Sequence, residues 1–159
     1  MSNETRTPVI ECRGLEKTYN DGSRELRILR GIDLAVHDGD LMVITGPSGV
    51  GKSTLLHIIG TLDRPSSGDV LFRGTSLRKT GRAAINRIRN EEIGFVFQFY
   101  HLLPEFTALE NVMMPALSRG RRRSQCQPRA EELLRTVGLT ERMEHKPGQL
   151  SGGEQQRVA

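Results

Sequence analysis

A glycine-rich stretch in the first third of the chain has the residue types and spacing of a phosphate-binding loop. The segment "GPSGVGKST", residues 46–54, matches the pattern G-x-x-x-x-G-K-[ST] and lies between an apolar run and a helical pattern. Glycines let the backbone approach a phosphate, and the amides of the loop and of the helix start point at its oxygens. Lys52 would bring positive charge to the β- and γ-phosphates, and the hydroxyl of Ser53 could ligate Mg²⁺. The pattern predicts a nucleoside triphosphate site built from Gly46, Pro47, Ser48, Gly49, Val50, Gly51, Lys52, Ser53 and Thr54.

The last ten residues, "LSGGEQQRVA", hold a second pattern that suits an anion. Ser151 and Glu154 form the S-x-x-E pattern of a capping box, which predicts that a helix begins here. A helix start carries about half a positive charge, and Gly152 and Gly153 keep side chains away from its amides. From spacing alone, the stretch could equally be a capped helix without a ligand. One nucleotide needs only one phosphate loop, so a second site of this type needs a further explanation.

Strands and helices of an α/β protein surround these motifs. Two alternating segments and three apolar runs predict strands, of which the run at 41–45 has the continuous apolar character of a buried parallel strand. The predicted strands are 9–19, 26–36, 41–45, "DVLF" (69–72) and "IGFVF" (93–97). Helical spacing is present in "GKSTLLHIIGTL" and "AAINRIRNEE". This order of elements favours an α/β fold with a mostly parallel sheet.

The second half of the chain carries clear signals for helix ends. Thr107 and Glu110 form a capping-box pattern that opens a helix over "ALENVMMPAL". Pro128 suits the first turn of a helix over "PRAEELLRTV", and Gly138 suits its C-terminal end. These signals predict two further helices between "AAINRIRNEE" and the final motif.

Composition limits the classes of protein that the chain can represent. With 159 residues, 36% hydrophobic and 26% charged, it fits one globular domain. No apolar run approaches the roughly 18 residues of a spanning helix, and "MSNETRTPVI" lacks the features of a signal peptide. The basic cluster at 119–123 favours a solvated turn over a nucleic-acid patch. Cys12 and Cys126 show no metal or redox spacing, which predicts buried or idle thiols in a reducing cytosol.

The pairing of "GPSGVGKST" with "LSGGEQQR" resembles the Walker A and signature motifs of ATP-binding cassette (ABC) ATPases. The resemblance covers essentially the whole chain. It implies a P-loop NTPase fold of the ABC type: N-terminal antiparallel strands, a mostly parallel core and a helical subdomain. In that family, two domains sandwich two ATP molecules head to tail, each between the phosphate loop of one domain and the signature of the other. The resemblance therefore implies ATP and Mg²⁺ as ligands, a homodimer, and Ser151, Gly152, Gly153 and Glu154 against the γ-phosphate of the partner's ATP.

Two further positions match residues that act in the family. Tyr19, in "EKTY", matches the aromatic residue that stacks on adenine, although a strand tyrosine could also serve packing alone. Gln98, in "FVFQ", matches the glutamine that reaches Mg²⁺ or the attacking water and senses the membrane partner. The resemblance thus implies Lys52 and Gln98 as catalytic residues and Ser53 and Gln98 as metal ligands.

The resemblance also implies how the chain is organised. Residues 1–98 and 150–159 would be pieces of the ATP-binding core, and about 99–149 the helical subdomain. The Walker B, D-loop and H-switch regions of the family, with the general-base glutamate, have no counterpart. We therefore expect an N-terminal part of one ABC ATPase domain, truncated after the signature motif. We expect it not to hydrolyse ATP by itself, since phosphoryl transfer needs a positioned metal and water, and to aggregate or stay loosely packed through an unpaired sheet edge.

Within the family, "LLHIIGTLDRPSSGDVLFRG" and "QFYHLLPEFTALENVMMP" most resemble the ATPases of lipoprotein-releasing systems. Macrolide-export and cell-division ATPases are near relatives and stay open as alternatives, as does a soluble ABC ATPase acting on nucleic acid. The first interpretation implies transmembrane permease subunits as partners, no direct nucleic-acid contact, and a place on the cytoplasmic side of the bacterial inner membrane. An apolar group before the third predicted helix fits either a docking surface for such subunits or a buried helical core; its residues are Tyr100, Leu102, Leu103 and Phe106.

Overall fold

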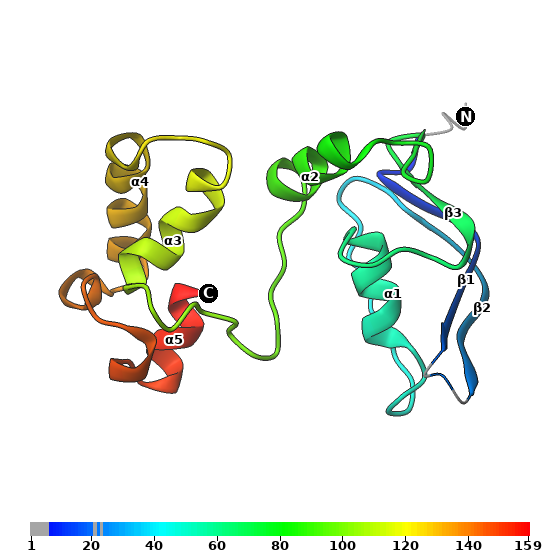
Figure 1. The fold of residues 1–159 in the computed structure, drawn as a ribbon, viewed down its shortest axis with the longest axis horizontal. Coiled ribbons are helices and arrows are strands. Elements are labelled where there is room, and N and C mark those ends of the chain that lie inside the picture. The colour runs from blue at the N-terminus through cyan, green and yellow to red at the C-terminus, as the bar shows by residue number, and fades with distance from the viewer. Residues whose placement is uncertain (1–6, 21, 23) are drawn as a thin grey trace. The chain divides into compact units, whose positions relative to one another are not determined.

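The computed structural model describes residues 7–20, 22 and 24–159. The chain forms two compact units, Met1–Gly94 and Phe95–Ala159, each with its own apolar core (Figure 1).

The first unit is built on an antiparallel sheet. Its four strands are β1 (Ile10–Asn20), β2 (Glu25–Val36), β3 (Ser67–Phe72) and β4 (Thr75–Ser76). They lie in the order β2-β1-β3-β4, so β1 pairs with both long neighbours. The strands predicted at 9–19, 26–36 and 69–72 are confirmed.

The sheet is irregular where β1 meets β3, because two glycines approach each other there. The register shifts between Arg13 and Glu16, and Gly14 and Gly68 have φ values of 52° and 78°. A Cβ on Gly68 would lie 2.3 Å from the carbonyl oxygen of Gly14. The amide of Gly14 donates a 2.7 Å hydrogen bond to Asp33 on β2. Only glycine therefore fits at position 68 without moving the backbone.

Two helices complete the first unit. α1 (Lys52–Ile59) follows the glycine-rich loop and buries Leu55 and Ile58 against the sheet. α2 (Arg82–Glu91) packs against the same core through Ile88. The buried core consists of Cys12, Leu15, Leu29, Leu55, Ile58, Val70, Phe72 and Leu77. This core fixes the start of α1, and hence the glycine-rich loop, against the sheet.

Two predicted strands are not formed in the part of the chain that the structure describes. Segments 41–45 and 93–97 have no strand structure, and Leu41, Val43 and Val96 are 95%, 76% and 98% exposed. A parallel strand is defined by hydrogen bonds to neighbouring strands, and no described strand pairs with either segment. The described sheet is therefore antiparallel throughout, instead of mostly parallel. The α/β class and the N-terminal antiparallel strands are confirmed.

The second unit is entirely helical. Its elements are α3 (Ala108–Leu117), α4 (Arg123–Thr136), η1 (Thr140–Arg142), η2 (Pro147–Gln149) and α5 (Gly152–Val158). α3 and α4 lie side by side, and α5 packs against the same core (Figure 1). The buried core consists of Ala108, Leu109, Met113, Cys126, Ala130, Leu134, Leu139, Leu150 and Val158. Residues 150–159 thus pack within this unit.

Most predicted helix ends agree with the structure. Thr107 and Glu110 form the reciprocal capping box, and Gly138 follows α4 with a φ of 72°. The prediction for Pro128 is wrong, because α4 begins at Arg123 and places Pro128 in its second turn. Pro128 has no amide hydrogen, so the helix loses one backbone hydrogen bond there but continues.

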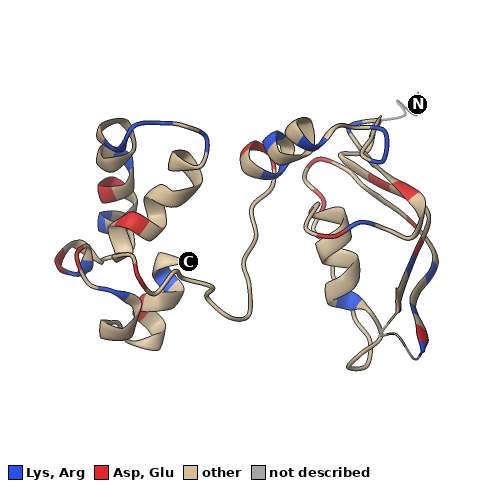
Figure 2. Cartoon of the chain, viewed as in Figure 1, with Lys and Arg blue, Asp and Glu red and all other residues tan. Residues whose placement is uncertain are grey.

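As predicted, the basic cluster lies in a turn and the two cysteines are buried. Residues 119–122 form the turn between α3 and α4, seen as a blue loop in Figure 2, and Arg123 pairs with Glu110 at 3.0 Å. Cys12 and Cys126 are buried and not disulfide-bonded. Burial, with the charges of Asp33 and Glu11, raises the pKa of Cys12 to about 11, so its thiol stays protonated at neutral pH. Among the described residues, no helix is long and apolar enough to span a bilayer.

Candidate nucleotide site

The glycine-rich loop has the backbone that a phosphate-binding loop requires. Gly46, Gly49 and Gly51 have φ values of 150°, 80° and 103°. A Cβ on Gly51 would lie 2.8 Å from Cγ2 of Ile28, so the loop packs tightly on β2. Gly51 caps α1 without a side-chain hydrogen bond, and the first turn of α1 contains no acidic residue. The amides at the start of α1 are therefore available to an anion.

Lys52 places its charge directly on this loop. Its Nζ donates hydrogen bonds to the carbonyl oxygens of Gly46, at 2.9 Å, and Pro47, at 2.8 Å. These neutral acceptors leave the positive charge of the ammonium uncompensated. A phosphate in the loop would therefore meet both the amides of α1 and a cation.

The hydroxyl of Ser53 is available to ligate Mg²⁺. The Ser53 side chain is exposed, and no hydrogen bond engages it within the described residues. Mg²⁺ takes oxygen ligands and is usually held by one or two protein groups, with substrate phosphates and water completing the shell. One free hydroxyl beside the predicted phosphate position satisfies that requirement.

Tyr19 is held by two charged residues. Its hydroxyl donates a 2.7 Å hydrogen bond to Oδ2 of Asp63, and the Lys17 ammonium lies 4.6 Å from the ring centroid. Lys17 is almost fully buried and bonds both Asp63, at 2.8 Å, and the carbonyl of Arg64, at 2.7 Å. The tyrosine is 42% exposed, so part of its ring remains open for stacking.

The pKa values in this cluster follow from its contacts. Burial tends to raise the pKa of Asp63, but hydrogen bonds from Lys17, Tyr19 and the amide of Arg64 outweigh it and lower the pKa. Burial and the neighbouring carboxylate of Asp63 raise the pKa of Tyr19. Asp63 is thus an ionised acceptor and Tyr19 a neutral donor at physiological pH.

Sequence reasoning did not identify Lys17 and Asp63. Lys17 lies two residues before Tyr19 on β1, so its side chain shares a face with the ring, and this spacing was a usable signal. Asp63 lies 44 residues after Tyr19 and has no local signal.

The final motif forms the capping box that the sequence predicts. The Glu154 amide donates to the Ser151 hydroxyl at 3.3 Å, and the Ser151 amide donates to the Glu154 carboxylate at 2.8 Å. Arg142 donates a 3.0 Å hydrogen bond to the other carboxylate oxygen. These bonds, the one from the Ser151 amide first, lower the pKa of Glu154 to about 2. Gly152 and Gly153 occupy the first two positions of α5.

The predicted site residues divide between the two units. Tyr19 and residues 46–54 belong to the first unit, while Gln98 and residues 151–154 belong to the second. The Gln98 side chain is exposed, and within the described residues no hydrogen bond engages it. In the apolar group before α3, Leu102 packs against the helical core, whereas Leu103 and Phe106 are exposed. Leu102 thus belongs to a helical core, and the docking of a partner on Leu103 and Phe106 stays a prediction.

Residues 29–159 match the family model described as ABC transporter. The chain belongs to the ABC transporter family. This membership confirms the resemblance carried by "GPSGVGKST" and "LSGGEQQR".

Similar proteins show which kind of ABC ATPase the chain resembles. It is 57% identical over 151 residues to the lipoprotein-releasing system ATP-binding protein LolD of Geobacter metallireducens, covering 95% of this chain and 67% of that protein. It is 53% identical to the LolD protein of Alcanivorax borkumensis, covering 96% of this chain and 67% of that protein. The chain thus spans about two thirds of the length of these relatives.

Two solved ABC cassettes share the fold. One is the dimeric ATP-binding cassette MJ0796 in a post-hydrolysis state bound to ADP and Pi, with a TM-score of 0.83 and 38% identity. The second is another dimeric structure of MJ0796, with a TM-score of 0.83 and 40% identity. Each comparison covers 94% of this chain and 66% of the other.

Proposed function

We propose that this chain binds ATP with Mg²⁺ and forms the ATP-binding part of a lipoprotein-releasing ABC transporter. The observation that carries the proposal is the glycine loop at the start of α1, with Lys52 held on it by two hydrogen bonds. The loop supplies amides and a cation for phosphates, and the tyrosine supplies an exposed ring for a base. The names of the most similar relatives support the transport role.

Each residue has a role that its chemistry fits. Residues 46–54 would hold the phosphates, with Lys52 neutralising charge that develops on the γ-phosphate and Ser53 ligating Mg²⁺. Tyr19 would stack on adenine. Gln98 would reach the metal or the attacking water, through an amide that the described residues leave unengaged. Mg²⁺, when bound, neutralises phosphate charge and orients the oxygens for in-line transfer.

The second anion-type motif fits a nucleotide held by another copy of the chain. Ser151–Glu154 would complete the site of that copy, so two chains would enclose two ATP molecules. The dimeric MJ0796 cassettes support this arrangement. ATP hydrolysis, transmembrane permease partners and a place on the cytoplasmic side of the bacterial inner membrane belong to the same proposal.

ATP binding by the purified chain tests the core of the proposal. We expect Lys52→Ala to weaken binding of Mg²⁺-ATP at least about tenfold, a loss of about 1.4 kcal/mol, because the phosphates lose their cation. Lys79→Ala is the matched control, since Lys79 is an exposed lysine of the same unit outside the loop. Equal affinity of the Lys52→Ala variant and the original chain, measured by calorimetry, would refute the site.

The transport role needs a separate experiment in cells. A tagged form of the protein should co-purify with transmembrane subunits from bacterial membranes. It should also restore lipoprotein release in cells depleted of their own ATPase. Restoration of macrolide resistance or of cell division instead would reassign the chain to a related ABC system.

A further inference from the structure

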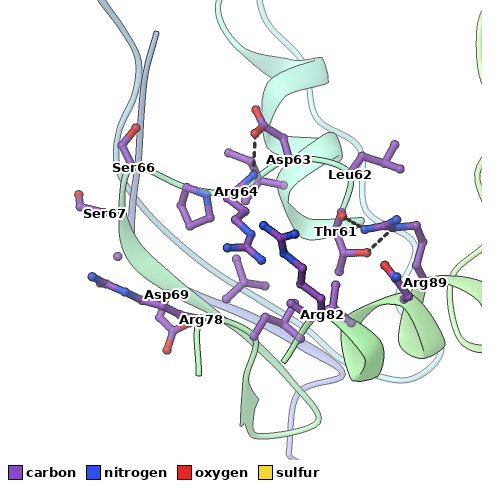
Figure 3. A pocket seen from close by; sticks show the side chains of 17 residues that line it. Thr61, Leu62, Asp63, Arg64, Ser66, Ser67, Asp69, Arg78, Arg82 and Arg89 are labelled. Carbon is purple, nitrogen blue, oxygen red and sulfur yellow. Dashed lines mark hydrogen bonds between the residues drawn. The ribbon is translucent and has the colours of Figure 1, made fainter. Parts of the chain in front are cut away.

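A concave site lies in the first unit, at the far end of α1 from the phosphate loop. This pocket of about 580 Å³ lies between the end of α1, the loop after it, β3 and α2 (Figure 3). Its apolar floor is formed by Ile58, Val70, Leu77 and Ile85. α1 begins at Lys52 and ends at Ile59, so its whole length separates the pocket from the phosphate loop.

The lining of this pocket is dominated by positive charge. Four arginines line it, Arg64, Arg78, Arg82 and Arg89, against two aspartates, Asp63 and Asp69. Asp63 is already neutralised, because Lys17 bonds it at 2.8 Å.

One of the arginines has a structural role. Arg89 donates from Nε to the hydroxyl of Thr61, at 3.1 Å, and from Nη2 to the Thr61 carbonyl, at 2.6 Å. These bonds connect α2 to the residues that end α1 and hold the two walls of the pocket together.

Arg64 and Arg82 are different, because their side chains point toward one another over the pocket (Figure 3). Arg64 comes from the loop after α1 and Arg82 from the first position of α2. In the part of the chain that the structure describes, no hydrogen bond or ion pair engages either guanidinium. Two like charges that face each other repel, and an anion between them would replace the repulsion by two attractions.

We propose that the pocket binds a small phosphate-bearing anion, with Arg64 and Arg82 as its ligands. A guanidinium presents a planar fork of donors that matches two phosphate oxygens, so two opposed forks can hold one phosphate from both sides. The volume exceeds that of a bare phosphate and falls in the range of pockets for small organic ligands. The phosphate therefore belongs to an organic ester whose other part lies on the apolar floor.

The ester can be soluble, such as a sugar phosphate, or a lipid headgroup, because both present the same oxygens to the arginines. The arginines proposed as ligands here are not part of the ATP site, so the two proposals can fail independently. Asp63 lines the pocket and also accepts the hydrogen bond of Tyr19, so the two sites share this one residue.

The test titrates a chain whose phosphate loop has been disabled by Lys52→Ala. Ribose 5-phosphate is added, and the Nε–H signals of Arg64 and Arg82 are followed by NMR. We expect both signals to shift, and we expect Arg64→Gln or Arg82→Gln to weaken binding about tenfold. Arg87→Gln is the matched control, because Arg87 lies on α2 but does not line the pocket, and its affinity should stay within about twofold.

A second titration separates the two sources of phosphate. Vesicles of phosphatidylcholine, with and without phosphatidic acid, replace ribose 5-phosphate in a sedimentation assay. Binding by either probe that depends on Arg64 and Arg82 but not on Arg87 supports the proposal and identifies the source. Equal losses in all three variants, or no binding tighter than about 10 mM by either probe, would overturn it. Arg82→Lys keeps the charge without the fork; it should bind weakly with an unchanged melting temperature, which excludes unfolding as the cause.

Discussion

The Tyr19 hydroxyl donates a 2.7 Å hydrogen bond to the carboxylate of Asp63, which lies 44 residues further along the chain. The same carboxylate bonds Lys17, whose ammonium faces the tyrosine ring at 4.6 Å. One face of the ring is thus engaged by a cation, and the hydroxyl is fixed at its edge. This arrangement orients the ring before any base arrives, which reduces the entropy lost on stacking.

Replacing Tyr19 should weaken binding of the adenine base and leave phosphate binding unchanged. We expect Tyr19→Ala to weaken ATP binding by about 5- to 150-fold, because base stacking contributes about 1–3 kcal/mol. Tyr19→Phe keeps the ring but loses the bond to Asp63, and its effect should not exceed about tenfold. Both variants should bind inorganic tripolyphosphate as the original chain does. A comparable loss of tripolyphosphate affinity would mean that Tyr19 stabilises the fold and does not stack on the base.

The hydroxyl of Ser53 should matter only when Mg²⁺ is present. The affinity for ATP is measured with Mg²⁺ and again with a chelator, and the ratio of the two is the readout. We expect Ser53→Ala to reduce this ratio severalfold, since the metal loses one of its proposed protein ligands. Ser76→Ala, a hydroxyl of the same unit outside the loop, serves as the control. An unchanged ratio in the Ser53→Ala variant would remove Ser53 from the metal site.

The capping box of α5 should make the second unit sensitive to acid. The folded-state pKa of Glu154 is lowered to about 2, below the value of 4.5 for a free glutamate. Its stabilising contribution is therefore complete above about pH 4.5 and is lost as the pH falls toward 2. We expect Glu154→Gln to lower the urea midpoint at pH 7 but not at pH 2. Circular dichroism of urea unfolding across this pH range measures the difference between the two proteins.

A second carboxylate provides the control for this pH dependence. Glu132 pairs with Arg129 on the exposed face of α4 and takes no part in a cap. Glu132→Gln should keep the acid sensitivity of the original chain, because Glu154 is still present. If the Glu154→Gln variant loses stability between pH 4.5 and 2 as steeply as the original chain, another carboxylate controls the transition.

Sequence patterns predicted those elements that depend on residues close together in the chain. The capping boxes at Thr107 and Ser151 depend on residues three apart, and the glycine loop depends on nine consecutive residues, so both could be read directly. The strands at 41–45 and 93–97 could not be settled in this way, because an apolar run becomes a strand only when a neighbour pairs with it. Other contacts depend on how distant segments of the chain come together, so local patterns do not predict them. Examples are the hydrogen bond from Tyr19 to Asp63 and the orientation of Arg64 toward Arg82.

The close approach of β1 and β3 should make Gly68 irreplaceable. In the Gly68→Ala variant, the new Cβ would lie 2.3 Å from the Gly14 carbonyl oxygen, and alanine would have to adopt a φ of 78°. We expect a loss of unfolding free energy of about 2 kcal/mol or more, from left-handed strain and from displaced backbone. Gly94→Ala is the control, because nothing lies within 4 Å of its Cβ position. Equal urea midpoints for the two variants would show that the strands separate easily at this point.

The exposed apolar residues of segments 41–45 and 93–97 should control self-association without controlling stability. Val43 and Val96 are 76% and 98% exposed, so they bury little surface in the fold but offer apolar contact to other chains. We expect Val43→Lys and Val96→Lys together to reduce light scattering and dye binding of the purified chain, with the melting temperature unchanged. Leu55→Ala, in the core beneath the phosphate loop, should instead lose about 2–5 kcal/mol of stability. A melting temperature lowered equally by the valine and leucine substitutions would mean that segments 41–45 and 93–97 are packed in solution.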